Sequence, residues 1–178
     1  MGRSGVPALS LAEWFVLGLV GERPTHGFAI ATLTGPEGEL GRVWRLRRAV
    51  VYRGLQRLQD LGLVAAIGVE STSHGPARTL VRATPHGEAA VRSWLTQPVE
   101  HVRDIRSELM VKLVLLDRAG TDPAELLTAQ RRAIEPIAEA LRADRDRARG
   151  FDRTLAGWRY ETTVATLAFL DEILTISR

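Results

Sequence analysis

The residues of this sequence best suited to specific chemistry lie in the segment Arg47–Leu61. When this segment is placed on a helix at about 100° per residue, one side is apolar and the other is polar. The apolar side consists of Val50, Val51, Leu55, Leu58 and Leu61. The polar side consists of Ala49, Tyr52, Arg53 and Gln56, with Arg48 and Arg57 beside it. The pattern predicts a helix with one face in a core and the other face available to a partner.

The polar side has the residue types that reading the major groove of DNA requires. Arg53 can bond guanine through two N–H groups, Gln56 can bond adenine, and Ala49 can touch the methyl group of thymine. The Tyr52 hydroxyl can reach a phosphate. Further arginines gather at the helix start, where backbone N–H groups also favour phosphate: Arg45, Arg47 and Arg48. An ordinary solvated helix face also carries Arg and Gln, so this segment alone leaves both interpretations open.

The elements that would position this helix can be predicted from the residues around it. Leu9–Val20 has apolar residues at helical spacing, and Gly21 and Pro24 end the pattern. Thr25 can cap a second helix over about residues 26–33. A turn-rich connection over residues 35–41 then leads to the third helix, which begins at residue 45 or 46 and stops at Gly62.

Two short β-like runs follow, Leu63–Val69 and Arg78–Ala83, with the polar turn formers of Glu70–Pro76 between them. They predict a β-hairpin whose tip carries His74 and Arg78 as further candidate DNA contacts. A fourth helix should start at residues 84–85 and run to about residue 95. The order of three helices, two strands and a helix predicts a winged helix-turn-helix domain over residues 1–97.

Residues 98–178 are predicted to be wholly helical and to form a dimerisation domain. Val102–Arg118 carries one apolar stripe, and residues 122–125 have the form of a capped helix start. That next helix should run towards Arg149, with Pro136 forcing a kink or a break. A last helix should reach about Ile176, with apolar residues spaced near 3.5, which suits helix-on-helix packing. The fold class is therefore mainly α, with an N-terminal winged helix-turn-helix, a two-stranded wing and a C-terminal helical region.

Composition narrows the class of protein further. The chain has 178 residues, a formal net charge of +3 and a pI of about 10.1, and Lys112 is its one lysine. It has no cysteine, which excludes disulfides and thiolate metal sites. Its start does not resemble a signal peptide, and its apolar stretches are too short to span a bilayer, so we expect a cytoplasmic protein with no membrane partner.

The sequence offers little support for catalysis or for a cofactor. The four histidines, at positions 26, 74, 86 and 101, lack the spacing of a metal site. The loop over residues 35–41 lacks the lysine of a phosphate-binding loop. No nucleophile motif such as G-x-S-x-G is present. We therefore expect no catalytic residues, no metal and no cofactor, and a protein that is not an enzyme.

Several short motifs, in order along residues 9–95, together resemble the PadR family of transcriptional regulators. They are Leu17-Gly-Leu19, Pro24-Thr-His-Gly-Phe28, Val51-Tyr-Arg-Gly-Leu-Gln-Arg-Leu58, Leu61-Gly-Leu-Val64, Gly75-Pro-Ala-Arg78 and Ala83-Thr-Pro-His-Gly87. The stretch Val102 to Leu116 is similar to the dimerisation segment of that family. Two positions depart from the family pattern. Phe28 stands where tyrosine is usual, and Ala49-Val50-Val51 replaces the commoner Gly-Thr-Leu, which leaves the preferred bases open.

The resemblance implies a two-fold homodimer that binds double-stranded DNA at an inverted repeat and represses transcription until a small molecule relieves it. Trp94, Trp158 and Tyr160 are candidate effector-binding residues, although the aromatic residues of the last helix suit a dimer core better. A second hypothesis remains open, in which a helical dimer uses its winged module for protein or small-molecule binding without DNA. The sequence does not disclose the effector, the operator, the regulated gene or whether the effect is repression or activation.

Overall fold

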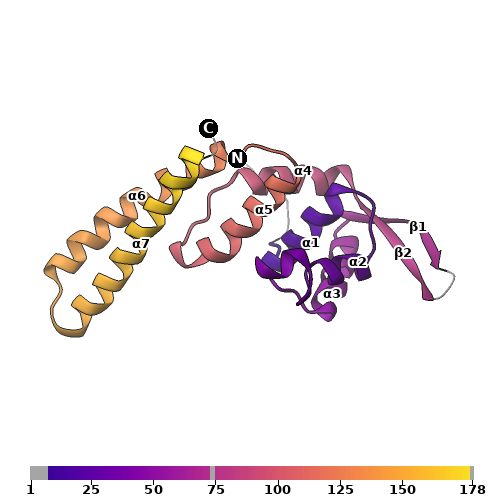
Figure 1. The fold of residues 1–178 in the computed structure, drawn as a ribbon, viewed down its shortest axis with the longest axis horizontal. Coiled ribbons are helices and arrows are strands. Elements are labelled where there is room, and N and C mark those ends of the chain that lie inside the picture. The colour runs from indigo at the N-terminus through magenta and orange to yellow at the C-terminus, as the bar shows by residue number, and fades with distance from the viewer. Residues whose placement is uncertain (1–7, 73–74, 177–178) are drawn as a thin grey trace. The chain divides into compact units, whose positions relative to one another are not determined.

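The computed structural model describes residues 8–72 and 75–176, which divide into two compact units, Met1–Leu95 and Thr96–Arg178. The first unit contains α1 (Leu11–Glu22), α2 (Gly27–Leu33), the 3-10 turn η1 (Glu39–Arg42), α3 (Arg48–Asp60), β1 (Val64–Thr72), β2 (Gly75–Ala83) and α4 (Pro85–Thr96). Figure 1 shows the two strands extending as a wing beside these helices. This order confirms the predicted winged helix-turn-helix with a two-stranded wing.

Helix α1 supplies much of the core of the first unit. It begins with a capping box, in which Ser10 and Glu13 each bond the backbone N–H of the other. Phe15 to Val20 are buried in succession, so α1 is surrounded by protein. The continuous burial explains why the helix is apolar on nearly every side.

The start of α2 differs from the prediction. His26, and not Thr25, is the N-cap residue, because its Nδ1 atom accepts a hydrogen bond from the Ala29 N–H at 3.0 Å. Thr25 instead pairs with Val81 of the wing through two backbone hydrogen bonds of 3.0 and 2.7 Å. The prediction was wrong because a long-range strand-like pairing holds the backbone of Thr25, which sequence spacing does not reveal.

The wing is longer than predicted. Residues assigned to a polar tip continue the two antiparallel strands, with Glu70 opposite Arg78. The register shifts between Ala66 and Gly68 and again between Glu70 and Thr72. Backbone pairing between strands stabilises polar residues in a β conformation that their own propensity does not favour. Gly62 lies between α3 and β1 and has a φ of +68°, a left-handed conformation that suits glycine. The prediction that α3 stops at Gly62 is confirmed.

The second unit contains the 3-10 turn η2 (Val102–Asp104), the π-helical turn η3 (Ile105–Leu109), α5 (Met110–Arg118), α6 (Ala124–Arg147) and α7 (Gly150–Ile176). The predicted helix over residues 102–118 is therefore three helical pieces. Of the kink or break predicted at Pro136, the break does not occur, since α6 continues through this residue. Ile134 and Ala138 on either side of Pro136 are buried, and this packing offsets the hydrogen bond that proline cannot make.

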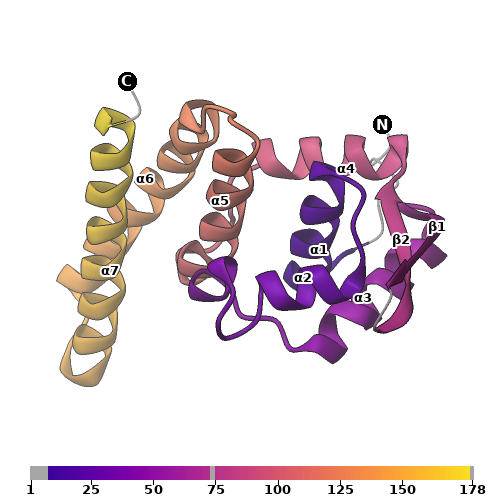
Figure 2. The ribbon, with the colours of Figure 1, turned by 45° about the vertical axis from the view of Figure 1, so that its right-hand side comes forward.

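Helices α6 and α7 form an antiparallel hairpin, as Figures 1 and 2 show. Leu170 and Thr163 of α7 are buried, and Arg131 of α6 donates to Asp171 of α7 at 2.7 Å. The first residues of the unit are fastened by side chains, because Gln130 makes two hydrogen bonds with the backbone of Val99, at 2.7 and 2.9 Å. The entry to the second unit is thus fixed to α6.

Candidate nucleic-acid interface

Helix α3 has one exposed and one buried face. Val51, Leu55 and Leu58 are buried. The predicted reading face, consisting of Ala49, Tyr52, Arg53 and Gln56, is exposed. The periodicity of the sequence therefore placed this helix in the correct orientation, and its polar face can meet a large partner.

The start of α3 gathers positive charge. Arg45, Arg47 and Arg48 are all exposed there. Arg47 is the N-cap residue and no side chain caps the helix, so α3 presents backbone N–H groups at its positive end. Arg45, Arg47 and Arg53 form no ion pair within residues 8–72 and 75–176, which keeps their charge available to an anion.

Two of the predicted residues have intramolecular partners. Gln56 donates from Nε2 to the Asp60 carboxylate at 2.9 Å, so one end of its amide is already engaged. Arg57 lies 3.1 Å from the Glu13 carboxylate, which ties it to α1. Arg57 is half exposed, but its charge is largely compensated, and its placement gives less support to a DNA contact than that of Arg53.

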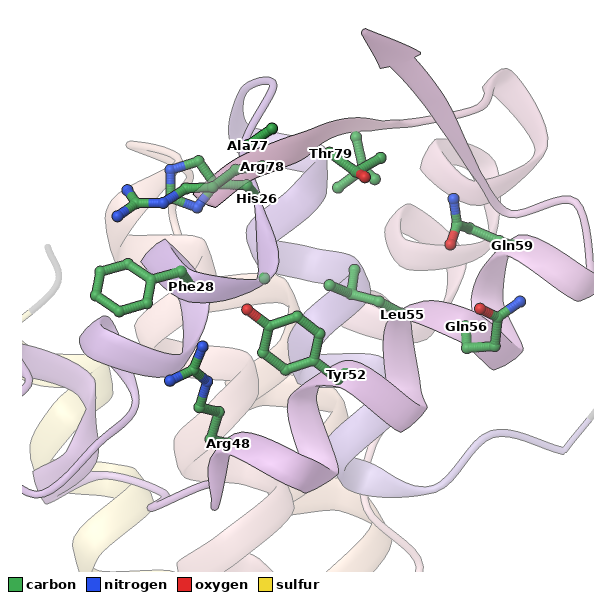
Figure 3. Close-up of a pocket in the computed structure, with 12 residues that line it drawn as sticks. His26, Phe28, Arg48, Tyr52, Leu55, Gln56, Gln59, Ala77, Arg78 and Thr79 are labelled. Atoms are coloured by element: carbon green, nitrogen blue, oxygen red, sulfur yellow. The ribbon is translucent and has the colours of Figure 1, made fainter. Parts of the chain in front are cut away.

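A groove of about 550 Å³ opens between α2, α3 and β2, and Figure 3 shows the side chains around it. Tyr52 and Gln56 of the reading face contribute to it, together with Arg48 at the start of α3. From the wing come Ala77, Arg78 and Thr79. The groove therefore joins the reading face of α3 to the wing on one side of the first unit.

Aromatic rings and arginines face one another in this groove. The guanidinium carbon of Arg48 lies 5.5 Å from the ring centroids of both Phe28 and Tyr52. That of Arg78 lies 4.3 Å from the ring centroid of Phe28. These are cation–π distances, which hold a guanidinium group in place without neutralising it.

The wing is fastened to α2 on the same side. His26 Nε2 lies 3.4 Å from a carboxylate oxygen of Glu70 on β1. Since His26 Nδ1 accepts from the Ala29 N–H, its neutral ring carries the proton on Nε2 and can donate it to Glu70. With the pairing of Thr25 and Val81, these contacts set the position of β2 relative to α3. His74, a predicted contact at the wing tip, lies outside the described residues.

The candidate effector residues have three different environments. Trp94 is buried and stacks on Trp14, with ring centroids 5.1 Å apart and planes 3° apart. Trp158 is 71% exposed and lines an open groove of about 360 Å³ on the second unit, beside Ile137 and Leu141. Tyr160 packs under the Arg145 guanidinium, 4.3 Å from its ring centroid, and does not line that groove.

Residues 8–72 and 75–176 contain no group of three or more His, Asp or Glu side chains arranged to hold a metal ion. Nor do they include a helix that is both long enough and apolar enough to cross a membrane.

Residues 16–93 match the model of a family described as the transcriptional regulator PadR-like family. The match runs from α1 to α4 and includes the groove. This part of the chain is similar to the PadR-like family. The match stops short of the second unit. A search of curated proteins found no match.

Solved structures similar to this chain include two of Bacillus subtilis PadR. The one in complex with operator DNA has a TM-score of 0.49 and 17% identity, covering 95% of this chain and 100% of the other. The one in complex with p-coumaric acid has a TM-score of 0.41 and 17% identity, covering 96% and 98%. The smu.1604c protein of Streptococcus mutans UA159 has a TM-score of 0.43 and 14% identity, covering 92% and 98%.

The sequence alone does not identify the residues that hold the interface side chains in place. They are His26, Phe28, Asp60 and Glu70. The signal available was the motif Pro24-Thr-His-Gly-Phe28, which places an imidazole and a ring beside a glycine. Glycine at position 27 favours this packing, because a Cβ atom there would lie 3.0 Å from the ring of Tyr52 and the ring would have to shift slightly.

Proposed function

We propose that this protein is a transcriptional repressor that binds an inverted-repeat operator in double-stranded DNA as a homodimer. The observation that carries the proposal is the exposed face of α3, where Arg53 has no ion pair among the described residues and adjoins a groove with two more arginines. The match of residues 16–93 to a family of transcriptional regulators supports the same conclusion. The function requires no catalytic residue and no cofactor, and we propose a cytoplasmic location for it.

Each candidate residue has a proposed role. Ala49, Arg53 and Gln56 contact base edges in the major groove, because their side chains are exposed on one face of α3. Arg45, Arg47, Arg48, Tyr52 and Arg78 bind backbone phosphates, since they surround the helix start and the groove. Arg57 and His74 complete the set of candidates at its edges. We assign residues 1–97 to DNA binding.

We propose that residues 98–178 form the dimerisation domain. The support is a row of exposed apolar side chains on α7, where Phe151, Leu155, Trp158 and Phe169 are 77%, 37%, 71% and 36% exposed. Exposed apolar surface of this kind marks an interface, and its spacing suits a second helix. A two-fold axis would present two copies of α3 to half-sites about one turn of DNA apart.

We propose further that a small molecule relieves repression, with Trp158 as the best placed of the three candidate residues because it lines a groove of about 360 Å³. Tyr160 stands outside that groove and Trp94 is buried against Trp14, so their roles would be indirect. p-Coumaric acid, the compound bound in one of the Bacillus subtilis PadR structures, is the first one to test.

The test is selection of bound sequences from a random duplex pool, followed by affinity measurements on the selected duplex. An inverted repeat should emerge, and Arg53→Ala or Gln56→Ala should each relax the preference at one position by about 1–3 kcal/mol. Arg92→Ala is a control, since this exposed residue pairs with Glu88 on α4. If the wild-type protein prefers no duplex over random DNA at moderate salt, the proposal is wrong and binding without DNA becomes the better interpretation.

A further inference from the structure

We propose that Phe28 is a positioning residue for DNA binding, which holds Arg78 of the wing and Arg48 of α3 as one phosphate-binding unit. The ligand is the phosphate backbone of duplex DNA. This inference rests on the proposed function and deepens it, because Phe28 is not itself a contact in that proposal.

The two arginines reach the same ring from different elements. Phe28 belongs to α2, Arg48 to α3 and Arg78 to β2. Figure 3 shows the ring of Phe28 between the side chains of the two arginines. Their guanidinium carbons lie 5.5 and 4.3 Å from its centroid and are therefore less than about 10 Å apart. The two arginines belong to different elements, and the side chain of Phe28 on α2 sets the distance between their charges.

Neither cation is neutralised within the described residues. The natural partner of Arg78 would be Glu70, which lies directly opposite it in the antiparallel ladder. Glu70 is instead directed to His26, 3.4 Å from its Nε2 atom. The face of an aromatic ring attracts a guanidinium group but leaves its N–H donors and its charge in place. Arg48 and Arg78 therefore present two guanidinium groups whose charge and N–H donors are available to a phosphate oxygen.

Backbone contacts around Phe28 fix the distance between Arg48 and Arg78. Val81 of β2 pairs with Thr25. Val81 lies three residues after Arg78, and Thr25 lies three residues before Phe28. This pairing fixes the wing to α2, and buried Gly27 packs α2 against Tyr52 and Leu55 of α3. Arg48 and Arg78 are held in place before DNA arrives, which lowers the entropy lost on binding.

The two arginines should depend on Phe28 to different degrees. Arg48 has a second ring beside it, that of Tyr52, also at 5.5 Å. Arg78 is closer to Phe28, at 4.3 Å, and extends from a two-stranded wing. Loss of the ring should therefore affect Arg78 more than Arg48.

The experiment compares Phe28→Leu, Phe28→Tyr, Arg78→Gln and the double variant Phe28→Leu/Arg78→Gln, with the selected duplex as probe and fluorescence anisotropy over a salt series. Leucine fills space without a ring, whereas tyrosine keeps the ring. Phe28 is 39% exposed, so these substitutions leave the core intact. Val69→Ala is the matched control, because Val69 is an exposed apolar residue of the wing that does not line the groove. Thermal unfolding of each variant reports any general loss of structure.

We expect Phe28→Leu to weaken binding by about 3- to 10-fold, the cost of immobilising one long side chain at an interface, and Phe28→Tyr to bind within about 2-fold of wild type. Arg78→Gln should lower the slope of log K against log salt by about 0.9, as for one lost phosphate contact. In the Arg78→Gln background, Phe28→Leu should have less than half of its effect on log K. Val69→Ala should bind like wild type.

The inference is overturned if Phe28→Leu binds like wild type, if Phe28→Tyr is as weak as Phe28→Leu, or if the effect of Phe28→Leu is the same with and without Arg78. It is also overturned if Phe28→Leu lowers the unfolding temperature enough to account for the loss of binding. In each of these cases the wild-type protein still binds its duplex, and the proposed function stands. If the wild-type protein prefers no duplex, the proposed function itself has failed.

Discussion

Replacement of the buried Lys112 by methionine should destabilise the second unit. Its side chain is 1% exposed, its Nζ atom lies 3.1 Å from Glu108 Oε1, and it donates to the carbonyl oxygen of Gln97 at 2.6 Å. The lysine therefore connects the first residues of the second unit to the helical segment over residues 105–118. Methionine has a similar length and keeps the apolar packing, so the change removes the charge and the donor.

The expected loss follows from the two contacts and from their burial. Removing one partner of a buried ion pair costs about 3–5 kcal/mol, whereas an exposed pair contributes about 0–1 kcal/mol. Glu108 is 30% exposed, so water can solvate part of its charge once the lysine is gone. Methionine also avoids the desolvation of an ammonium group. We therefore expect the free energy of unfolding to fall by about 2–3 kcal/mol.

The same lysine makes a prediction about pH. Burial lowers the pKa of Lys112 below its ordinary value of 10.5, and the hydrogen bond and the charge of Glu108 oppose this shift without cancelling it. Between the lowered pKa and 10.5, the unfolded chain binds more protons at this site than the folded chain does. The contribution of Lys112 to the free energy of unfolding should therefore rise as pH approaches 10.5 from below.

The assay is urea unfolding followed by circular dichroism, at one protein concentration because the proposed dimer would make stability depend on concentration. Arg92→Met is the matched control, since Arg92 and Glu88 have the same i,i+4 spacing but are 71% and 47% exposed and 3.9 Å apart. This control should lose less than about 1 kcal/mol. A loss for Lys112→Met no larger than that of Arg92→Met would refute the reasoning. The reasoning would also be refuted if the difference in free energy of unfolding between wild type and Lys112→Met fell as pH rises towards 10.5.

Four further predictions concern the first unit. Asp60→Ala should tighten binding to the selected duplex by about 2- to 5-fold in anisotropy measurements, because it removes a carboxylate near the phosphates and releases the amide of Gln56; weaker binding would contradict this. Gly27→Ala should weaken DNA binding and lower stability by about 1–2 kcal/mol, since its Cβ atom would lie 3.0 Å from a ring carbon of Tyr52; unchanged affinity would show that Tyr52 need not hold this position. Gly87→Ala should destabilise by about 3 kcal/mol, because its Cβ atom would lie 2.1 Å from the carbonyl oxygen of Leu63. Gly21→Ala should instead stabilise α1 by about 0.5 kcal/mol, because a Cβ atom at this position would meet nothing within 4 Å. If Gly87→Ala and Gly21→Ala changed the unfolding temperature equally, the packing argument would be wrong.

The sequence by itself determined the order of the elements and the orientation of α3. Val51, Leu55 and Leu58 repeat at helical spacing, so burial of these three residues forces Tyr52, Arg53 and Gln56 to the surface. Gly62 and Pro85 mark the end of one helix and the start of another through their own backbone preferences. These features are local, and a local pattern suffices to predict them.

The tertiary structure decided which of those exposed residues are committed to other partners. Arg57 pairs with Glu13, forty-four positions earlier, and Glu70 is drawn from Arg78 to His26. Thr25 is held by Val81, which is why His26 caps α2 in its place. Pro136 is tolerated within α6, where Ile134 and Ala138, two residues to either side of it, are buried. Each outcome depends on a contact between distant parts of the chain, and the energy of such a contact cannot be read from residue spacing.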